Sequence, residues 1–196
     1  MINSKADYFY YLECDRVALR QKRKNPLLIP GKEVWKYQRL LRKTEYYTNC
    51  KRKNPIRLWL KWRLHVLSVK YGFSIPLNAF GPGLSIAHVG PIIINSKSKI
   101  GANCRIQTSV TLGATNGSTQ APVLGNNVFL GDGCKLIGAI TVADDVAIGA
   151  NAVVVKSIAE PGTTWGGVPA KKISNNSSES NLVKATEIVN RSKKVT

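Results

Sequence analysis

The sequence predicts a mainly β protein: a parallel β-helix built from six-residue repeats, preceded by an α-helical segment. Aliphatic side chains recur at every sixth position over residues 124–154. Over residues 75–160, β-branched residues, Gly and Asn dominate and charged residues become rare. Residues 3–70 instead show amphipathic stretches with apolar side chains three to four positions apart, a spacing typical of α-helices.

The 196 residues divide into three parts by composition. Residues 1–72 are expected to form a basic α-helical N-terminal segment, and residues 73–173 the β-helix. Residues 174–196 read as a polar C-terminal tail with a short helix. Breaks at Asn25-Pro26 and Asn54-Pro55 divide the first part into three helices, because Pro is favoured at helix starts and not in helix interiors.

Two aliphatic positions recur in each six-residue repeat. The first set is Leu124, Leu130, Leu136, Val142, Ile148 and Val154, and the second set begins four residues later at Val128. Residues at the expected corners are Asn103, Asn127, Gly133, Ala139, Asp145 and Asn151. Gly, Asn and Asp tolerate the backbone of a sharp corner, so each repeat predicts one flat side of a β-helix. Residues 113–122, rich in Gly, Ser and Thr, predict a loop excursion from one coil.

The net charge of +18 first suggests a nucleic-acid partner. Residues 1–72 carry most of it, with 18 Lys and Arg against 5 Asp and Glu, and they contain no recognised nucleic-acid motif. We therefore expect no nucleic-acid partner. The N-terminal residues lack the pattern of a secretion signal, so the four cysteines are expected to be reduced thiols and the protein cytoplasmic. Cys104 and Cys134 fall on inward positions of the repeat.

Several motifs together resemble the serine acetyltransferase branch of the hexapeptide acyltransferases. They are Leu84-Ser-Ile-Ala-His-Val-Gly90, the repeats, the excursion and Gly167-Val-Pro-Ala-Lys-Lys-Ile173. The basic N-terminal segment, with Asp7-Tyr-Phe-Tyr-Tyr-Leu-Glu-Cys-Asp-Arg16, is more similar to homologues in polysaccharide gene clusters. The resemblance implies a left-handed β-helix and a homotrimer with active sites between subunits. It also implies acetyl transfer from acetyl-CoA to a hydroxyl, with no metal.

The resemblance places His88 at the position of the catalytic base. A neutral imidazole suits that task near pH 7, whereas His65, within a basic helical stretch, is expected to have a packing or surface role. The positions that match coenzyme A contacts are Gly131, Asp132, Ala150, Val155, Lys156 and Lys171. Small residues would let the pantetheine approach the backbone, and the lysines could pair with phosphates.

Two departures from the family bear on the acceptor. Ala87 stands where serine acetyltransferases have Asp, and Gln120-Ala121 where they have an Arg-His pair. An amino acid needs counter-charges for its ammonium and carboxylate. We therefore expect a sugar hydroxyl of a surface polysaccharide (capsule, lipopolysaccharide or exopolysaccharide) or of its precursor as acceptor. The candidate acceptor contacts are Asn78, Thr115, Asn116 and Gln120.

Two alternatives remain for the function. One is a serine O-acetyltransferase of cysteine biosynthesis. The other is a non-catalytic basic protein that binds a membrane surface or nucleic acid, although this leaves His88 unexplained. For the leading hypothesis, the basic helices are expected either to line a site for an anionic glycan or to contact anionic lipid at the inner membrane face.

Overall fold

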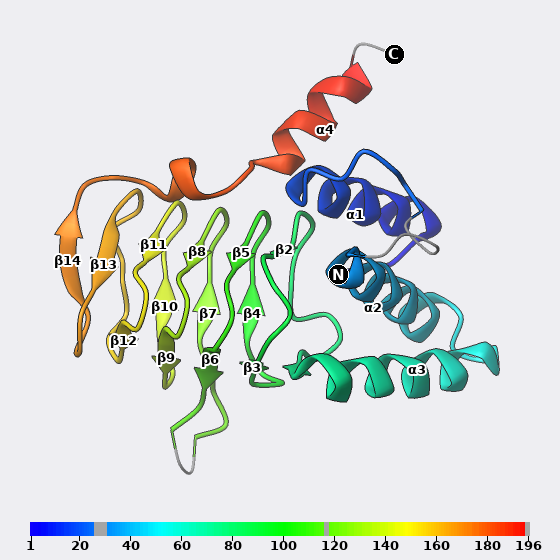
Figure 1. Ribbon diagram of the computed structural model, residues 1–196, viewed down its shortest axis with the longest axis horizontal. Helices are drawn as coiled ribbons and strands as arrows, with labels where there is room; N and C mark the ends of the chain where they lie inside the picture. Colours follow the sequence, from blue (N-terminus) through cyan, green and yellow to red (C-terminus); the bar gives the residue numbers. More distant parts are fainter. Residues whose placement is uncertain (26–30, 116–117, 195–196) are drawn as a thin grey trace.

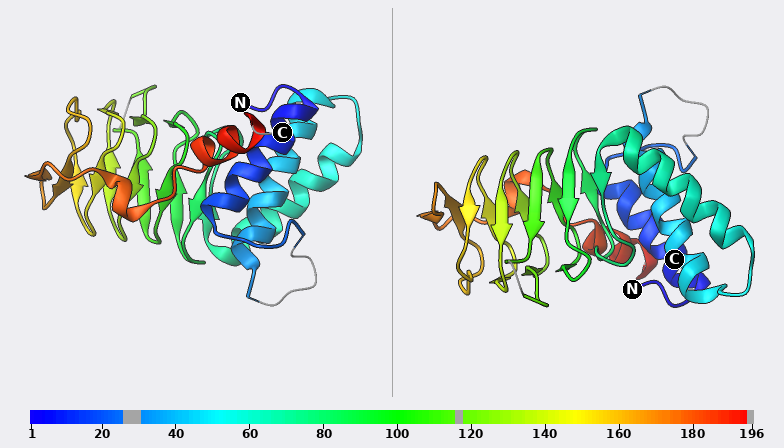
Figure 2. Two further views of the ribbon diagram at one scale, coloured as in Figure 1. Left: turned by 90° about the horizontal axis from the view of Figure 1, so that it is seen from above. Right: turned by 90° about the horizontal axis from the view of Figure 1, so that it is seen from below.

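The computed structural model describes residues 1–25, 31–115 and 118–194. A triangular prism of short strands occupies one side of the molecule, and α-helices cover its N-terminal end (Figures 1 and 2). The helices are α1 (Lys5–Ala18), α2 (Glu33–Cys50) and α3 (Ile56–Tyr71), so the predicted helical N-terminal segment is confirmed. Ser4 caps α1 by accepting a hydrogen bond from the Asp7 backbone N–H, and Gly72 ends α3 with φ of 74°.

The prism has three faces, each a sheet. Sheet A contains β1 (Phe73–Ser74), β3 (Ile92–Ile94), β6 (Val110–Gly113), β9 (Lys135–Ile137) and β12 (Val153–Val154). Sheet B contains β4 (Lys99–Ile100), β7 (Val123–Leu124) and β10 (Thr141–Val142). Sheet C contains β2 (Ser85–Ile86), β5 (Arg105–Ile106), β8 (Phe129–Leu130), β11 (Ala147–Ile148), β13 (Thr164–Gly166) and β14 (Lys171–Ser174). The chain visits A, B and C in turn, and the paired strands described are parallel except β13 with β14.

The aliphatic positions of the repeat form the core, as predicted. Side chains of the first set, from Leu124 to Val154, and of the second set, from Val128 to Ile158, are at most 5% exposed. Strands pair with an 18-residue offset in the regular coils, for example Val153 with Lys135, which is three six-residue repeats. The parallel β-helix is confirmed, and it is the left-handed type that the resemblance implied.

Positive φ angles occur at five of the six expected corners. They are Asn103, Asn127, Gly133, Asp145 and Asn151, with φ between 55° and 70°. At the sixth corner Ala139 keeps an ordinary backbone and the neighbouring Gly138 takes φ of 103°. Asn103, Asn127 and Asp145 stack above one another, and their side chains form a hydrogen-bonded ladder with distances of 2.8 and 3.0 Å. We call this corner the asparagine edge.

Polar side chains from α1 and α2 cover the open N-terminal end of the β-helix. The Gln38 side-chain amide donates a hydrogen bond to the Leu84 carbonyl at 2.8 Å and accepts one from the Ile86 N–H at 3.0 Å. A neighbouring strand would make the same kind of contacts with β2. Asp15 accepts from the N–H groups of Gly83 and Leu84 at 2.9 and 2.8 Å. The first coil therefore has partners for backbone groups that an uncovered sheet edge would leave unpaired.

A buried ion-pair cluster fixes the same junction. The Arg42 guanidinium contacts Asp15 at 2.8 Å and Glu45 at 3.0 Å, and its side chain is fully buried. It also donates to the carbonyls of Phe80 and Gly81 in the first coil. The two carboxylates raise the pKa of Arg42 above its usual range despite burial, so the guanidinium stays charged.

The C-terminal tail returns along the asparagine edge from the last coil to the helical end (Figure 1). After β14 it forms a short 3-10 helix (Ser178–Asn181) and then α4 (Ala185–Lys194). Ser178 donates hydrogen bonds to the backbone carbonyls of Asp145 and Asn127. The Lys184 ammonium group pairs with the Asp145 carboxylate at 3.1 Å, and the Thr186 backbone N–H donates to the Asn103 side chain. In α4, Ala185 and Val189 pack against α1, so the tail is a fixed part of the fold.

Replacing Arg42 should destabilise the junction strongly. Arg42→Met leaves Asp15 and Glu45 buried without their cation, which is expected to lower the free energy of unfolding by about 3–5 kcal/mol. The matched control is Arg16→Met, because Arg16 pairs with Glu13 at the surface and should lose less than about 1 kcal/mol. Urea unfolding measures both, and equal losses would contradict a structural role for the buried cluster.

The cysteines should differ sharply in reactivity. Burial raises the pKa of Cys14 and of Cys134 to about 12 and that of Cys104 still further, so little thiolate exists there at pH 8. Cys50 is partly exposed. Ellman's reagent should therefore detect one thiol in the native protein, none in Cys50→Ser, and the remaining thiols only after unfolding. Fast labelling of the native Cys50→Ser variant would contradict the burial of the other three thiols.

Candidate functional site

His88 lies in the turn that follows β2, where the chain passes from sheet C to sheet A. Turns stack at this corner in successive coils, which we call the His88 edge: residues 87–91, 107–109, 131–134 and 149–152. Backbone hydrogen bonds connect them in order, from Ala87 to Ile106, from Gln107 to Leu130 and from Gly131 to Ile148, at 2.9 to 3.0 Å. His88 itself is exposed, and among the described residues it has no hydrogen-bond partner.

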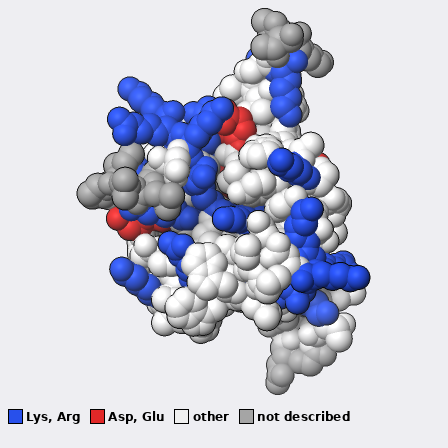
Figure 3. Space-filling model, turned by 90° about the vertical axis from the view of Figure 1, so that its right-hand side faces the viewer, with Lys and Arg blue, Asp and Glu red and all other residues white. Residues whose placement is uncertain are grey.

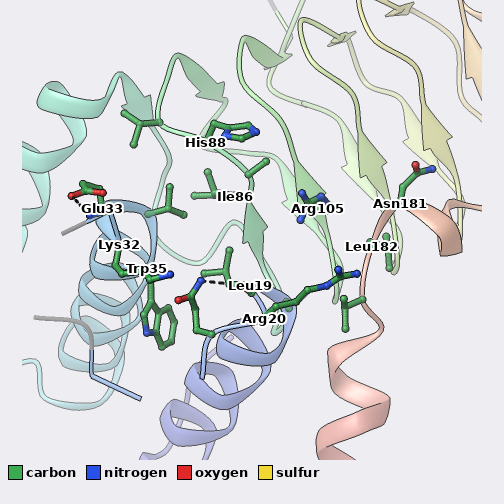
Figure 4. A pocket seen from close by; sticks show the side chains of 17 residues that line it. Leu19, Arg20, Lys32, Glu33, Trp35, Ile86, His88, Arg105, Asn181 and Leu182 are labelled. Atoms are coloured by element: carbon green, nitrogen blue, oxygen red, sulfur yellow. Dashed lines mark hydrogen bonds between the residues drawn. The ribbon is translucent and has the colours of Figure 1, made fainter. Parts of the chain in front are cut away.

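A cavity of about 510 Å³ opens beside His88. It lies between the first coils, the end of α1, the start of α2 and the returning tail (Figure 4). Trp35, which is buried, and Ile86 contribute apolar surface. Residues 181–183 of the tail also line it. Both the helical segment and the tail thus help to form the surroundings of the histidine.

Three cations and one carboxylate line this cavity: Arg20, Lys32, Arg105 and Glu33. Arg105 projects from β5 and donates to the Ser85 hydroxyl at 3.1 Å, and Arg20 follows the C-terminal end of α1. Burial, with a smaller contribution from the positive charge of Arg20, lowers the pKa of Arg105. Neither guanidinium has a carboxylate partner among the described residues. The cavity is therefore suited to a ligand that carries an anionic group.

Three of the predicted coenzyme A positions lie along the His88 edge, and a fourth lies beyond its last turn. Gly131, Asp132 and Ala150 are in stacked turns, and Lys171 begins β14 opposite Gly166. A Cβ on Gly131 would lie 2.7 Å from the Ala150 backbone N, so this glycine is required by coil stacking alone. Asp132 accepts a hydrogen bond from the Thr108 hydroxyl of the preceding coil. The edge offers small residues, exposed turns and one terminal cation.

The other predicted positions lie elsewhere in the chain. Val155 and Lys156 follow β12, at the corner between sheets A and B, which we call the loop edge. Thr115 and Gln120 are exposed in the excursion at the same corner, the projection below β6 in Figure 1, and Asn116 lies outside the described residues. Within one chain, Val155, Lys156, Thr115 and Gln120 therefore lie at a different corner of the prism from His88.

Asn78 does not line the cavity beside His88. It sits in the junction of α2 with the first coil, where its backbone N–H donates to Glu45 at 2.7 Å. Its side-chain amide exchanges two hydrogen bonds with Asn49, at 2.8 and 3.1 Å. These contacts hold a backbone turn with φ of 63° and engage both the oxygen and the nitrogen of the side-chain amide.

Sequence reasoning missed Arg20, Arg105 and Glu33 as neighbours of His88. A signal existed for Arg105, one of few charged residues in the coils, on the outward position beside the inward Ile106. In the pairing of β2 with β5, Arg105 lies opposite Ser85, which precedes Ala87 by two residues. Arg20 and Glu33 carry no such signal, because their position depends on how the helices dock.

The β-helix is similar in sequence and structure to serine acetyltransferases. A serine acetyltransferase of Helicobacter pylori is 44% identical over 95 residues, which cover 47% of this chain and 55% of the relative. One of Buchnera aphidicola is 34% identical over 138 residues, 67% of this chain and 50% of the relative. The chain thus spans about half the length of the curated relatives it matches. No family model matches it.

Among solved structures, a serine acetyltransferase in complex with CoA superimposes with a TM-score of 0.67 at 26% identity. The match covers 86% of this chain and 71% of that one. The expected sugar acceptor is contradicted, because these relatives are named for serine. Outside the aligned motif, Arg20, Arg105 and Glu33 place charges of both signs in the cavity beside His88. The predicted resemblance to the serine acetyltransferase branch of the hexapeptide acyltransferases is confirmed.

Proposed function

We propose that the chain is an acetyl-CoA-dependent serine O-acetyltransferase, an enzyme of the kind that serves cysteine biosynthesis. The observation that carries this proposal is the cavity in which an exposed histidine faces two unpaired guanidiniums and one carboxylate. A free amino acid presents one carboxylate, one ammonium group and, in serine, one hydroxyl. Arg20 and Arg105 can pair with the carboxylate, and Glu33 can pair with the ammonium group. This arrangement brings the hydroxyl near His88.

The acetyl thioester supplies an activated carbonyl, and His88 supplies the base. His88 takes the proton from the serine hydroxyl as that oxygen attacks the carbonyl carbon. The carbon–sulfur bond then breaks, and the imidazolium returns its proton to the departing sulfur. The products are O-acetylserine and free coenzyme A, and His88 is again neutral. Arg20 and Arg105 hold the carboxylate, so the hydroxyl approaches the base in a fixed orientation.

The His88 edge is the proposed path of acetyl-CoA along the β-helix. The buried Gly131 lets the turns stack closely, the exposed Ala150 presents a low surface to the pantetheine, and the exposed Lys171 lies where a phosphate could pair with it. A similar solved structure is a complex with CoA, which supports this assignment. We also propose that the reaction takes place in the cytoplasm, where the thiols expected for the cysteines would stay reduced.

A homotrimer would reconcile the two separated groups of predicted site residues. Lys156, Val155 and the excursion lie on the loop edge, whereas His88 and Gly131 lie on a different corner of the prism. In a cyclic trimer the loop edge of one subunit can face the His88 edge of its neighbour, and each site then takes residues from both. This arrangement is part of the proposal, and Lys156 would contact the cofactor from the neighbouring subunit.

Purified protein should release coenzyme A from acetyl-CoA in the presence of serine, measured by thiol detection. His88→Ala should lower kcat by about 10²–10⁴-fold, the usual contribution of a general base. His65→Ala is the control, because His65 is exposed on α3 and distant from the cavity lining. Release with oligosaccharides and none with serine would overturn the proposal.

Arg105→Met should raise KM for serine while leaving KM for acetyl-CoA unchanged. A hydrogen bond to a charged group contributes about 1.5–3 kcal/mol, so the expected increase is about 10- to 150-fold. Serinamide, which lacks the carboxylate, shows whether a loss of activity comes from lost carboxylate recognition or from a disturbed coil. If Arg105→Met impairs serinamide as much as serine, Arg105 supports the coil and does not recognise the carboxylate. Lys97→Met, an exposed cation elsewhere on the coils, is the matched control.

A further inference from the structure

Helix α3 has two apolar faces, and the part of the chain that the structure describes covers one of them. Leu60 and Leu64 are buried, and Leu67 and Tyr71 continue this stripe against the core of the protein. The stripe has the spacing of three to four residues that one helix face requires. It accounts for the attachment of α3 to α2 and to the first coil.

The opposite face carries a second apolar stripe that the described chain leaves open. Leu58, Trp62, Val66 and Val69 follow one another at intervals of four, four and three residues, and 45–71% of each is exposed. Trp59, 49% exposed, lies beside them. These side chains share a helix face about opposite Leu60 and Leu64. Large apolar residues gathered on one exposed face indicate a contact surface rather than scattered surface hydrophobics.

Positive charges flank this stripe on both sides. Residues 51–72 contain seven Lys and Arg and no Asp or Glu. By helical position, Lys61 lies along one side of the stripe and Arg63 and Lys70 along the other. Arg63 also stacks over the Trp59 ring, 5.2 Å from its centroid. Figure 3 shows Lys and Arg gathered over the helical end of the molecule, with little Asp or Glu beside them.

We propose that α3 lies on an anionic lipid surface, with its exposed stripe at the boundary between headgroups and acyl chains. An apolar face bordered by Lys and Arg is the pattern of an interfacial helix. Trp62 and Trp59 suit it further, because tryptophan side chains favour the membrane–water boundary. None of the described helices is long and apolar enough to cross a bilayer, so the contact is peripheral.

Charge argues against a second copy of this chain as the occupant. A two-fold interface would place the same basic stripe of each copy against the other, with no carboxylate in residues 51–72 to neutralise it. An anionic bilayer instead attracts every one of these cations. No residue of α3 lines the cavity beside His88, so this contact is compatible with an open acetyl-transfer site and does not depend on it.

Vesicle co-sedimentation of the full chain tests the proposal. The protein should bind phosphatidylcholine vesicles that contain phosphatidylglycerol, bind phosphatidylcholine alone far more weakly, and dissociate as salt rises. Trp62→Ser/Val69→Ser removes apolar contacts, and Lys61→Glu/Lys70→Glu reverses charge. Each double variant should weaken binding roughly tenfold or more. These side chains are exposed, so circular dichroism and thermal unfolding should match the parent protein.

Lys97→Glu/Lys99→Glu is the matched control, because it makes the same charge change on exposed lysines of the coils. Its binding should stay within a small factor of the parent. An equal loss in both charge variants would overturn the proposal in favour of diffuse attraction by net charge. Failure to bind anionic vesicles would also overturn the proposal. Self-association in solution that Trp62→Ser/Val69→Ser abolishes would overturn it as well. Tighter binding to a nucleic-acid duplex than to vesicles, lost in the α3 variants, would assign the surface to nucleic acid.

Discussion

The unpaired edge of the first coil is the constraint on which the rest of the structure depends. A parallel β-helix begins with a strand that has a neighbour on one side only, and the backbone groups on the other side need partners. Gln38 and Asp15 supply them from two helices, and Arg42 neutralises the buried carboxylate that this solution introduces. The positions of α1 and α2 follow from these contacts, and α3 packs in turn on α2.

The same docking forms the surroundings of His88. The end of α1 and the start of α2 meet the first coils beside this histidine, so Arg20 and Glu33 come from the covering helices while Arg105 comes from a coil. Of the three residues proposed to hold the acceptor, two therefore come from the covering helices, and none lies in the turns proposed for acetyl-CoA. The helices thus add charges of both signs, from Arg20 and Glu33, beside a coil motif that contains none.

The periodic part of the chain could be predicted from sequence, and the docked parts could not. Inward positions such as Leu130 and corners such as Asn127 follow from local rules of period and backbone geometry. His88 followed from a resemblance over contiguous residues. Asn78 was expected to contact the acceptor, whereas it lies in a turn held by Glu45 and Asn49, and these contacts are distant in sequence. Arg20 was missed for the same reason, since helix docking is set by tertiary contacts that no period encodes.

The returning tail changes how a protein built from stacked coils is expected to unfold. In a repeat protein each coil contacts only its neighbours, so the terminal coil can detach without disturbing the others. Here Ser178, Lys184 and Thr186 attach one segment to three successive coils, and α4 ends against α1. The tail thus connects the last coil to the helical end through a continuous series of contacts. Loss of one end loosens the other, which favours unfolding as a single cooperative unit.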